Sequence, residues 1–137
     1  MPIGYRRNMT ESGGVFYIPN STANGAIRAG AAIATVNTGT VQLEECSASS
    51  NAQAFIGFAN EAAGNGDAVG VVSLRGSTVT PIVEGGGNLT AGDPVWLSAT
   101  LGEVTQTPLT SDLSLRCGMA ISTTEMMLAS DVQIDLG

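Results

Sequence analysis

Carboxylates are the side chains of this sequence whose type and spacing are most suggestive of chemistry. The candidates stand in pairs or beside a turn: Glu44 with Glu45, Glu61 with Asp67, and Asp93. Two facing carboxylates can serve as the acid and the base of a glycosidase. Sugar sites also stack their ligands on aromatic side chains, and aromatic residues are only 4% of this chain. Neighbours in a strand point to opposite faces, so we expect Glu44 and Glu45 to be solvated rather than catalytic.

The chain lacks two residue types on which most other catalytic sites depend. It contains no histidine, and its five cationic side chains are all arginines. Without histidine, Ser-His-Asp and Cys-His nucleophiles and imidazole metal sites are excluded. Without lysine, the phosphate-binding P-loop and Schiff-base catalysis are excluded as well. We therefore predict that the protein is not an enzyme and has no catalytic residues, no cofactor and no metal ligands. A divergent hydrolase that uses carboxylates such as Asp93 is one alternative.

Two further motifs have simple structural explanations. The sequence GNGD (64–67) resembles the start of a calcium loop, but it lacks the alternating carboxylates and the closing glutamate of an EF-hand. We expect a turn there. Cys117 lies in an apolar run, which favours a buried, reduced thiol. With Cys46 it makes two cysteines, too few for a disulfide framework.

Composition narrows the classes of partner. The net charge is -7, which disfavours binding to nucleic acids and to anionic membrane surfaces. No apolar run reaches 18 residues, and the N-terminus lacks the apolar segment of a secretory signal. We expect the protein to stay in the compartment where it is made. Only 12% of the residues are charged, which suits a protein packed against partners over much of its surface.

Short β-rich runs separated by glycine turns predict an all-β fold for residues 27–137. No window keeps the apolar spacing of an amphipathic helix over three turns. The expected strands are 31–36, 40–44, 54–59, 68–74, 77–83, 94–98, 103–106, 115–122, 126–128 and 132–136. A tight hairpin through Arg75 and Gly76 is expected to join 68–74 to 77–83.

The sequence also contains an internal repeat. Residues 27–43 resemble 89–107, where the second copy has one inserted residue, and 55–59 resemble 116–120. The aligned pairs are Ile27 with Leu89, Gly30 with Gly92, Ile33 with Val95, Gly39 with Gly102, Val41 with Val104, and Gly57 with Gly118. Two similar halves of this kind can close one small β-barrel or β-sandwich. Chance similarity between simple sequences is the alternative.

The stretch LTAGDPVWLS (89–98) combines a carboxylate with the only tryptophan of the chain. Gly92 and Asp93 are turn residues, and Pro94 is tolerated at the first position of a strand. We therefore expect a turn that begins a strand. Trp96 then points away from Val95 and Leu97, so it either fills part of the core or forms a subunit interface.

Residues 1–26 differ from the rest of the chain. They are polar and rich in Gly, Ser, Thr and Asn, with one apolar island at 15–18. We predict an extended N-terminal arm over 1–26, followed by the β-domain at 27–137.

These motifs resemble those of the small capsid-cement, or head-decoration, proteins of tailed bacteriophages, including the lambda-type decoration protein. The residues that carry the resemblance are AGAAI (29–33), FIGFA (55–59), GDAVGVVSLRG (66–76), LTAGDPVWLS (89–98) and LRCGMAI (115–121). The resemblance implies a β-tulip-like fold and a structural virion protein without catalytic activity. Such a protein is made in the cytoplasm of the bacterial host. It acts as a homotrimer on the outer capsid surface, where it clamps neighbouring copies of the phage major capsid protein and stabilises the expanded shell.

The resemblance also implies that the N-terminal arm contacts the capsid. The expected contact residues are Tyr5, Arg6, Arg7, Phe16, Tyr17 and Ile18. The aromatic and aliphatic members can add a strand to a capsid sheet, and the arginines can pair with capsid carboxylates. The alternative function is a small β-barrel binding module of a phage tail or cell surface that recognises a receptor or a glycan, although the low aromatic content argues against sugar stacking.

Overall fold

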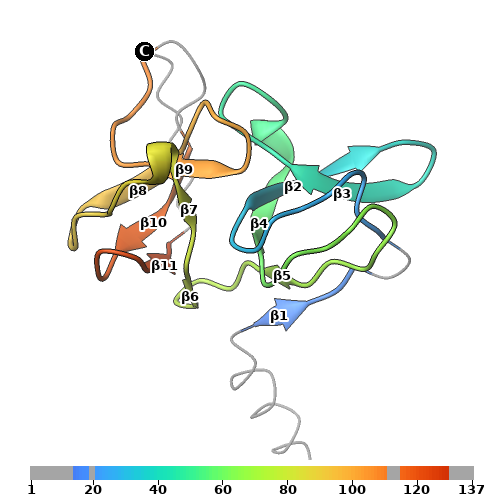
Figure 1. Cartoon of the computed structure of the whole chain (residues 1–137), viewed down its shortest axis with the longest axis horizontal. Helices are drawn as coiled ribbons and strands as arrows, with labels where there is room; N and C mark the ends of the chain where they lie inside the picture. The colour runs from blue at the N-terminus through green and yellow to red at the C-terminus, as the bar shows by residue number, and fades with distance from the viewer. Residues whose placement is uncertain (1–13, 19–20, 111–114, 130–137) are drawn as a thin grey trace, which may run out of the picture.

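The computed structural model describes residues 14–18, 21–110 and 115–129. They form two curled β-sheets, the first to the right and the second to the left in Figure 1. The predicted all-β class, a small barrel or sandwich, is confirmed.

The first sheet has the strand order β1-β5-β4-β2-β3, and the second has the order β6-β11-β10-β8-β9-β7. The strands of the first sheet are β1 (Val15–Phe16), β2 (Ala32–Asn37), β3 (Val41–Glu45), β4 (Phe55–Ala59) and β5 (Val71–Val72). Those of the second are β6 (Thr78–Val79), β7 (Ile82–Val83), β8 (Pro94–Leu97), β9 (Glu103–Thr105), β10 (Arg116–Ala120) and β11 (Met126–Leu128). Two 3-10 turns, η1 (Ala52–Ala54) and η2 (Glu84–Gly86), lie in the connections.

The two sheets repeat one topology strand by strand. In each, a hairpin (β2–β3 or β8–β9) is flanked by the next strand along the chain, then by the last strand, then by the first (β1 or β6). At the opposite edge, Ala23 bridges Leu43 in parallel, and β7 runs parallel to β9 in the same place. Two similar halves are therefore present in the structure.

A β-bulge falls at the same position in both halves. Along β4 the pairing with β2 skips Ile56, and along β10 the pairing with β8 skips Cys117. The equivalent pairs are Ile33 with Gly57 and Val95 with Gly118, then Ala34 with Phe55 and Trp96 with Arg116. A shared bulge in a shared register supports duplication over chance similarity, since bulges are specific features of a fold.

The predicted alignment of the two hairpins is wrong by two residues. Thr35 pairs with Leu43 in the first hairpin, and Leu97 pairs with Val104 in the second. Leu43, rather than Val41, is therefore the counterpart of Val104. The second hairpin is one residue shorter than the first, not one residue longer.

The connection between the halves also differs from the prediction. Residues 77–83 form two strands rather than one, because Pro81 has no N–H to donate to a ladder. β6 and β7 lie at opposite edges of the second sheet. Ser77 N–H donates to Leu74 O at 3.0 Å in a turn where Gly76 has φ 90°, but the flanking β5 and β6 belong to different sheets, so there is no hairpin. The strand expected at 132–136 lies outside the described residues.

The predicted boundary at residue 26 is too late for the described part of the N-terminal segment. In β1, Val15 pairs with Val72 of β5 and packs against the core. Ala23 is fully buried, and its N–H donates to Asp67 O at 2.8 Å. Apolar burial and ladder bonds thus make 14–18 and 21–26 part of the β-domain. The remainder of the predicted arm, 1–13 and 19–20, lies outside the described residues.

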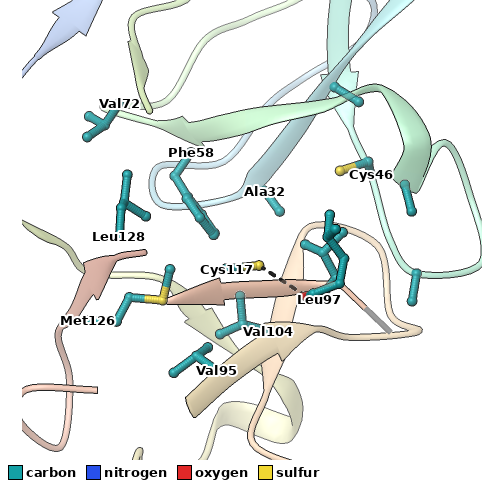
Figure 2. Packing of buried hydrophobic residues seen from close by; sticks show 14 of the residues in the cluster. Ala32, Cys46, Phe58, Val72, Val95, Leu97, Val104, Cys117, Met126 and Leu128 are labelled. Atoms are coloured by element: carbon teal, nitrogen blue, oxygen red, sulfur yellow. Dashed lines mark hydrogen bonds between the residues drawn. The ribbon is translucent and has the colours of Figure 1, made fainter. Parts of the chain in front are cut away.

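The main hydrophobic core lies between the two halves, and we call it the shared core (Figure 2). Its members from the first half include Ala32, Ala34, Cys46, Phe58 and Val72, and those from the second include Val95, Leu97, Val104, Cys117, Met126 and Leu128. A second cluster covers the opposite face of the first sheet, where Ile33, Leu43 and Val71 pack against segments around 23–27 and 63–69. The first sheet is thus buried on both faces, which accounts for the uninterrupted apolar run at 31–34.

Candidate functional site

The adjacent carboxylates Glu44 and Glu45 have structural partners. Glu45 accepts hydrogen bonds from the backbone N–H and from Nη2 of Arg28, both at 2.8 Å. Its side chain is 8% exposed, so the expectation of a solvated Glu45 is wrong. The hydrogen bond to Glu45 is the main reason that the pKa of Arg28 is raised. Glu44 accepts from the side-chain amides of Asn24 and Asn51.

Arg28 also joins the two halves. Its Nη2 donates to Leu101 O at 2.7 Å, and its Nη1 lies 3.5 Å from Oε2 of Glu103. Both residues belong to the β8–β9 hairpin of the second half. The arginine and its carboxylates therefore hold the halves in register and leave no free acid–base pair at Glu45.

The other carboxylates of interest lie in turns, as predicted. Gly92 N–H donates to Ala120 O at 2.8 Å, Asp93 O accepts from Ala120 N–H at 3.0 Å, and β8 begins directly afterwards at Pro94. Asp67 Oδ2 accepts from Gly64 N–H at 3.1 Å and closes the second turn. Among the described residues, no three His, Cys, Asp or Glu side chains are grouped so that they could hold a metal ion.

The two cysteines are free and buried in the shared core. Burial, followed by the nearby charges of Glu44 and Glu45, raises the pKa of Cys46 to about 12. Burial likewise raises the pKa of Cys117. Both thiols are therefore protonated at neutral pH, which disfavours a nucleophilic role.

One candidate interaction surface surrounds the outermost strand of the first sheet. We call it the β1 patch, and it comprises Phe16, Tyr17 and Leu74, which are 39%, 53% and 53% exposed. Within the described residues, β1 has a strand neighbour on one side only (Figure 1). The Tyr17 ring lies against Gly70, where a Cβ would be 3.1 Å from the tyrosine oxygen. The patch thus combines a free strand edge with exposed apolar side chains.

The predicted capsid-contact residues do not all lie in this patch. Phe16 and Tyr17 are exposed, whereas Ile18 is half-buried against the second cluster. Tyr5, Arg6 and Arg7 lie outside the described residues. Leu74 was not predicted, because a leucine at a strand end does not reveal from the sequence whether it is covered.

A second candidate surface is the outer face of the second sheet. We call it the Trp96 face, and it comprises Pro94, Trp96, Arg116, Met119 and Met127, all half-buried. Val95 and Leu97 point the other way into the shared core. Trp96 is therefore not a core residue of that cluster. The same alternation along β10 places the side chain of Arg116 on the outer face and that of Cys117 on the face toward the shared core.

Two donors on this face have no acceptor. Trp96 and Arg116 are direct partners on β8 and β10, and Trp96 Nε1 and Arg116 Nε are buried atoms without a hydrogen-bond partner among the described residues. Leaving a buried donor unpaired costs about 1–3 kcal/mol.

No protein-family model matches the chain, and no curated protein matches it. No helix in the described ranges is long and apolar enough to cross a membrane.

Proposed function

We propose that the protein is a capsid decoration, or cement, protein of a tailed bacteriophage. In this role it binds the outer surface of the mature shell as a homotrimer, clamps neighbouring major capsid proteins and performs no catalysis. The resemblance of five sequence motifs supports the family. The all-β fold and the structural use of the Glu45 and Asp67 carboxylates are consistent with a binding protein rather than a hydrolase.

The β1 patch is the observation that carries the proposal. A strand edge offers backbone donors and acceptors to an incoming strand, and adjacent side chains give that pairing its specificity. Phe16 and Tyr17 supply such side chains beside the free edge of β1. Tyr5, Arg6 and Arg7 lie eight to ten residues before β1 in the sequence, within reach of the same contact.

Clamping follows from multivalency. Each subunit of a trimer would offer one patch to a different capsid subunit. Once the first patch is bound, the others act at a high effective concentration, so that modest contacts give tight attachment. Attachment of this kind holds neighbouring capsid subunits at a fixed spacing.

The test is binding to mature shells of the phage that encodes the protein, measured by co-sedimentation. We expect the double variant Phe16→Ser with Tyr17→Ser to bind at least about tenfold more weakly at an unchanged melting temperature. Val41→Ser is the matched control, because Val41 is 49% exposed at the other edge of the first sheet. Wild-type occupancy by the double variant, or no binding by the wild type, would overturn the proposal.

A further inference from the structure

The two halves of the chain pack on each other through unlike faces. In the first half, the residues that face the shared core are Ala32, Ala34, Phe55, Phe58 and Val72. Their counterparts by pairing register in the second half are Pro94, Trp96, Arg116, Met119 and Met127. These five are the Trp96 face, which points away from the shared core. The second half uses its opposite face, with Val95 and Met126, to fill that core.

The Trp96 face and the core-facing side of the first half are therefore equivalent surfaces with different coverings. On the first half, it is covered by the second half of the same chain. On the second half, the equivalent face carries the unpaired donors of Trp96 and Arg116 and belongs to neither hydrophobic cluster. Tryptophan, methionine and arginine are the residue types enriched at protein interfaces.

Charge restricts the occupant further. The side chain of Arg116 forms no hydrogen bond or ion pair with any described residue. The chain carries 12 acidic side chains against five cations, so a second copy is rich in acceptors. The far side of the first half offers them: residues 60–68 cover the second cluster and expose Glu61 and Asp67.

We propose that the Trp96 face is a head-to-tail subunit interface that receives the 60–68 segment of a second copy of this chain. Glu61 and Asp67 of one copy would pair with the guanidinium of Arg116 of the next, and Trp96 with its two neighbouring methionines would supply the apolar contact. Because the two surfaces differ, the contact is heterologous and closes into a ring when the rotation permits. The inference deepens the proposed oligomeric decoration protein, but it concerns the isolated protein and needs no capsid.

Self-association of the full chain, measured by analytical ultracentrifugation without shells, tests this interface. We expect the wild type to associate, and Trp96→Ala or Arg116→Glu to raise the dissociation constant about 30-fold or more. Trp96→Phe keeps an aromatic ring of smaller area, so a weaker loss of about tenfold is expected. Far-ultraviolet circular dichroism and the melting transition confirm that each variant is folded.

A charge reversal identifies the opposing surface. Adding Glu61→Arg to Arg116→Glu should restore association, whereas adding Glu125→Arg, an exposed carboxylate on the second half, should not. A monomeric wild type, full association of Arg116→Glu, or a Glu61→Arg and Arg116→Glu double variant that stays apart would each overturn the interface. If the wild type is monomeric and Arg116→Glu abolishes shell binding, the face belongs to the capsid contact instead. If the wild type is monomeric but still binds shells normally, this inference is refuted and the proposed function is not.

Discussion

Gly57 and Gly118 occupy the same place in the two halves, each beside the β-bulge and each beneath a carbonyl oxygen of the next strand. A Cβ on Gly57 would collide with Val72 O, and a Cβ on Gly118 would collide with Met127 O. Val72 and Met127 are themselves equivalent by register. The glycines therefore allow the close approach of β4 to β5 and of β10 to β11 that each half repeats.

We expect Gly118→Ala to lower the free energy of unfolding by about 2 kcal/mol or more, because the atom it meets is backbone and cannot rotate away. Urea denaturation measures the change. Gly87→Ala is the matched control, since the nearest atom to its Cβ would be Glu84 O at 3.9 Å, in ordinary contact. Similar midpoints for the two variants would contradict the role given to Gly118.

Two N-terminal deletions should separate the arm from the fold. Removing residues 2–13 takes away none of the described strands, so the melting temperature should stay near that of the wild type while shell binding falls. Removing residues 2–20 also deletes β1 and its pairing with Val71 and Val72, so the melting temperature should drop by several degrees. Equal melting temperatures for the two deletions would show that β1 is dispensable.

Arg28→Gln should weaken the link between the halves. It leaves the poorly exposed Glu45 carboxylate without its cation, and we expect a loss of about 1–2 kcal/mol, moderated because the Arg28 side chain is 49% exposed. A double-mutant cycle with Glu45→Gln checks the pairing, and the second substitution should cost little in the Arg28→Gln background. Additive losses would indicate that the two side chains act independently.

Stability should fall at alkaline pH because of the buried thiols. The pKa of Cys46 rises from 9.0 to about 12 on folding, so above pH 9 the unfolded chain releases a proton that the folded chain retains. The stability is complete below pH 9 and is lost as the pH rises toward 12, with a loss of about 1.4 kcal/mol at pH 10. Urea denaturation at pH 8 and pH 10 measures it. In Cys46→Ala the pH dependence should shrink by that amount, and an unchanged dependence would contradict the assignment.

The sequence was informative wherever local chemistry decides the structure. Glycine turns and β-rich runs predicted most strands, and the turn at Gly92 and Asp93 was predicted with its strand. The long-range pairing of strands could not be predicted from the sequence. Nothing local shows that the strands on either side of Arg75 and Gly76 join different sheets, or that Val15 and Phe16 pair with a strand more than fifty residues away.

The same limit applies to the interaction surfaces. Alternation along β8 separated Trp96 from Val95 and Leu97, but exposure depends on what the rest of the chain covers. Leu74 is therefore exposed and Ile18 half-buried, although both are apolar residues next to short strands. The burial of Glu45 was missed for a related reason, since its arginine partner lies 17 residues away in the chain.

Packing through unlike faces also bears on how the two halves have evolved. Genetic exchange between repeats normally keeps them similar. Here, an exchange of β2 for β8 would place a tryptophan at the position of Ala34, where the two sheets meet, and an alanine at the half-buried position of Trp96. Residues that shape the backbone, such as Gly57 and Gly118, can stay common to both repeats. A repeat that is clear at its glycines and faint elsewhere is therefore the expected record of a duplication whose products can no longer recombine.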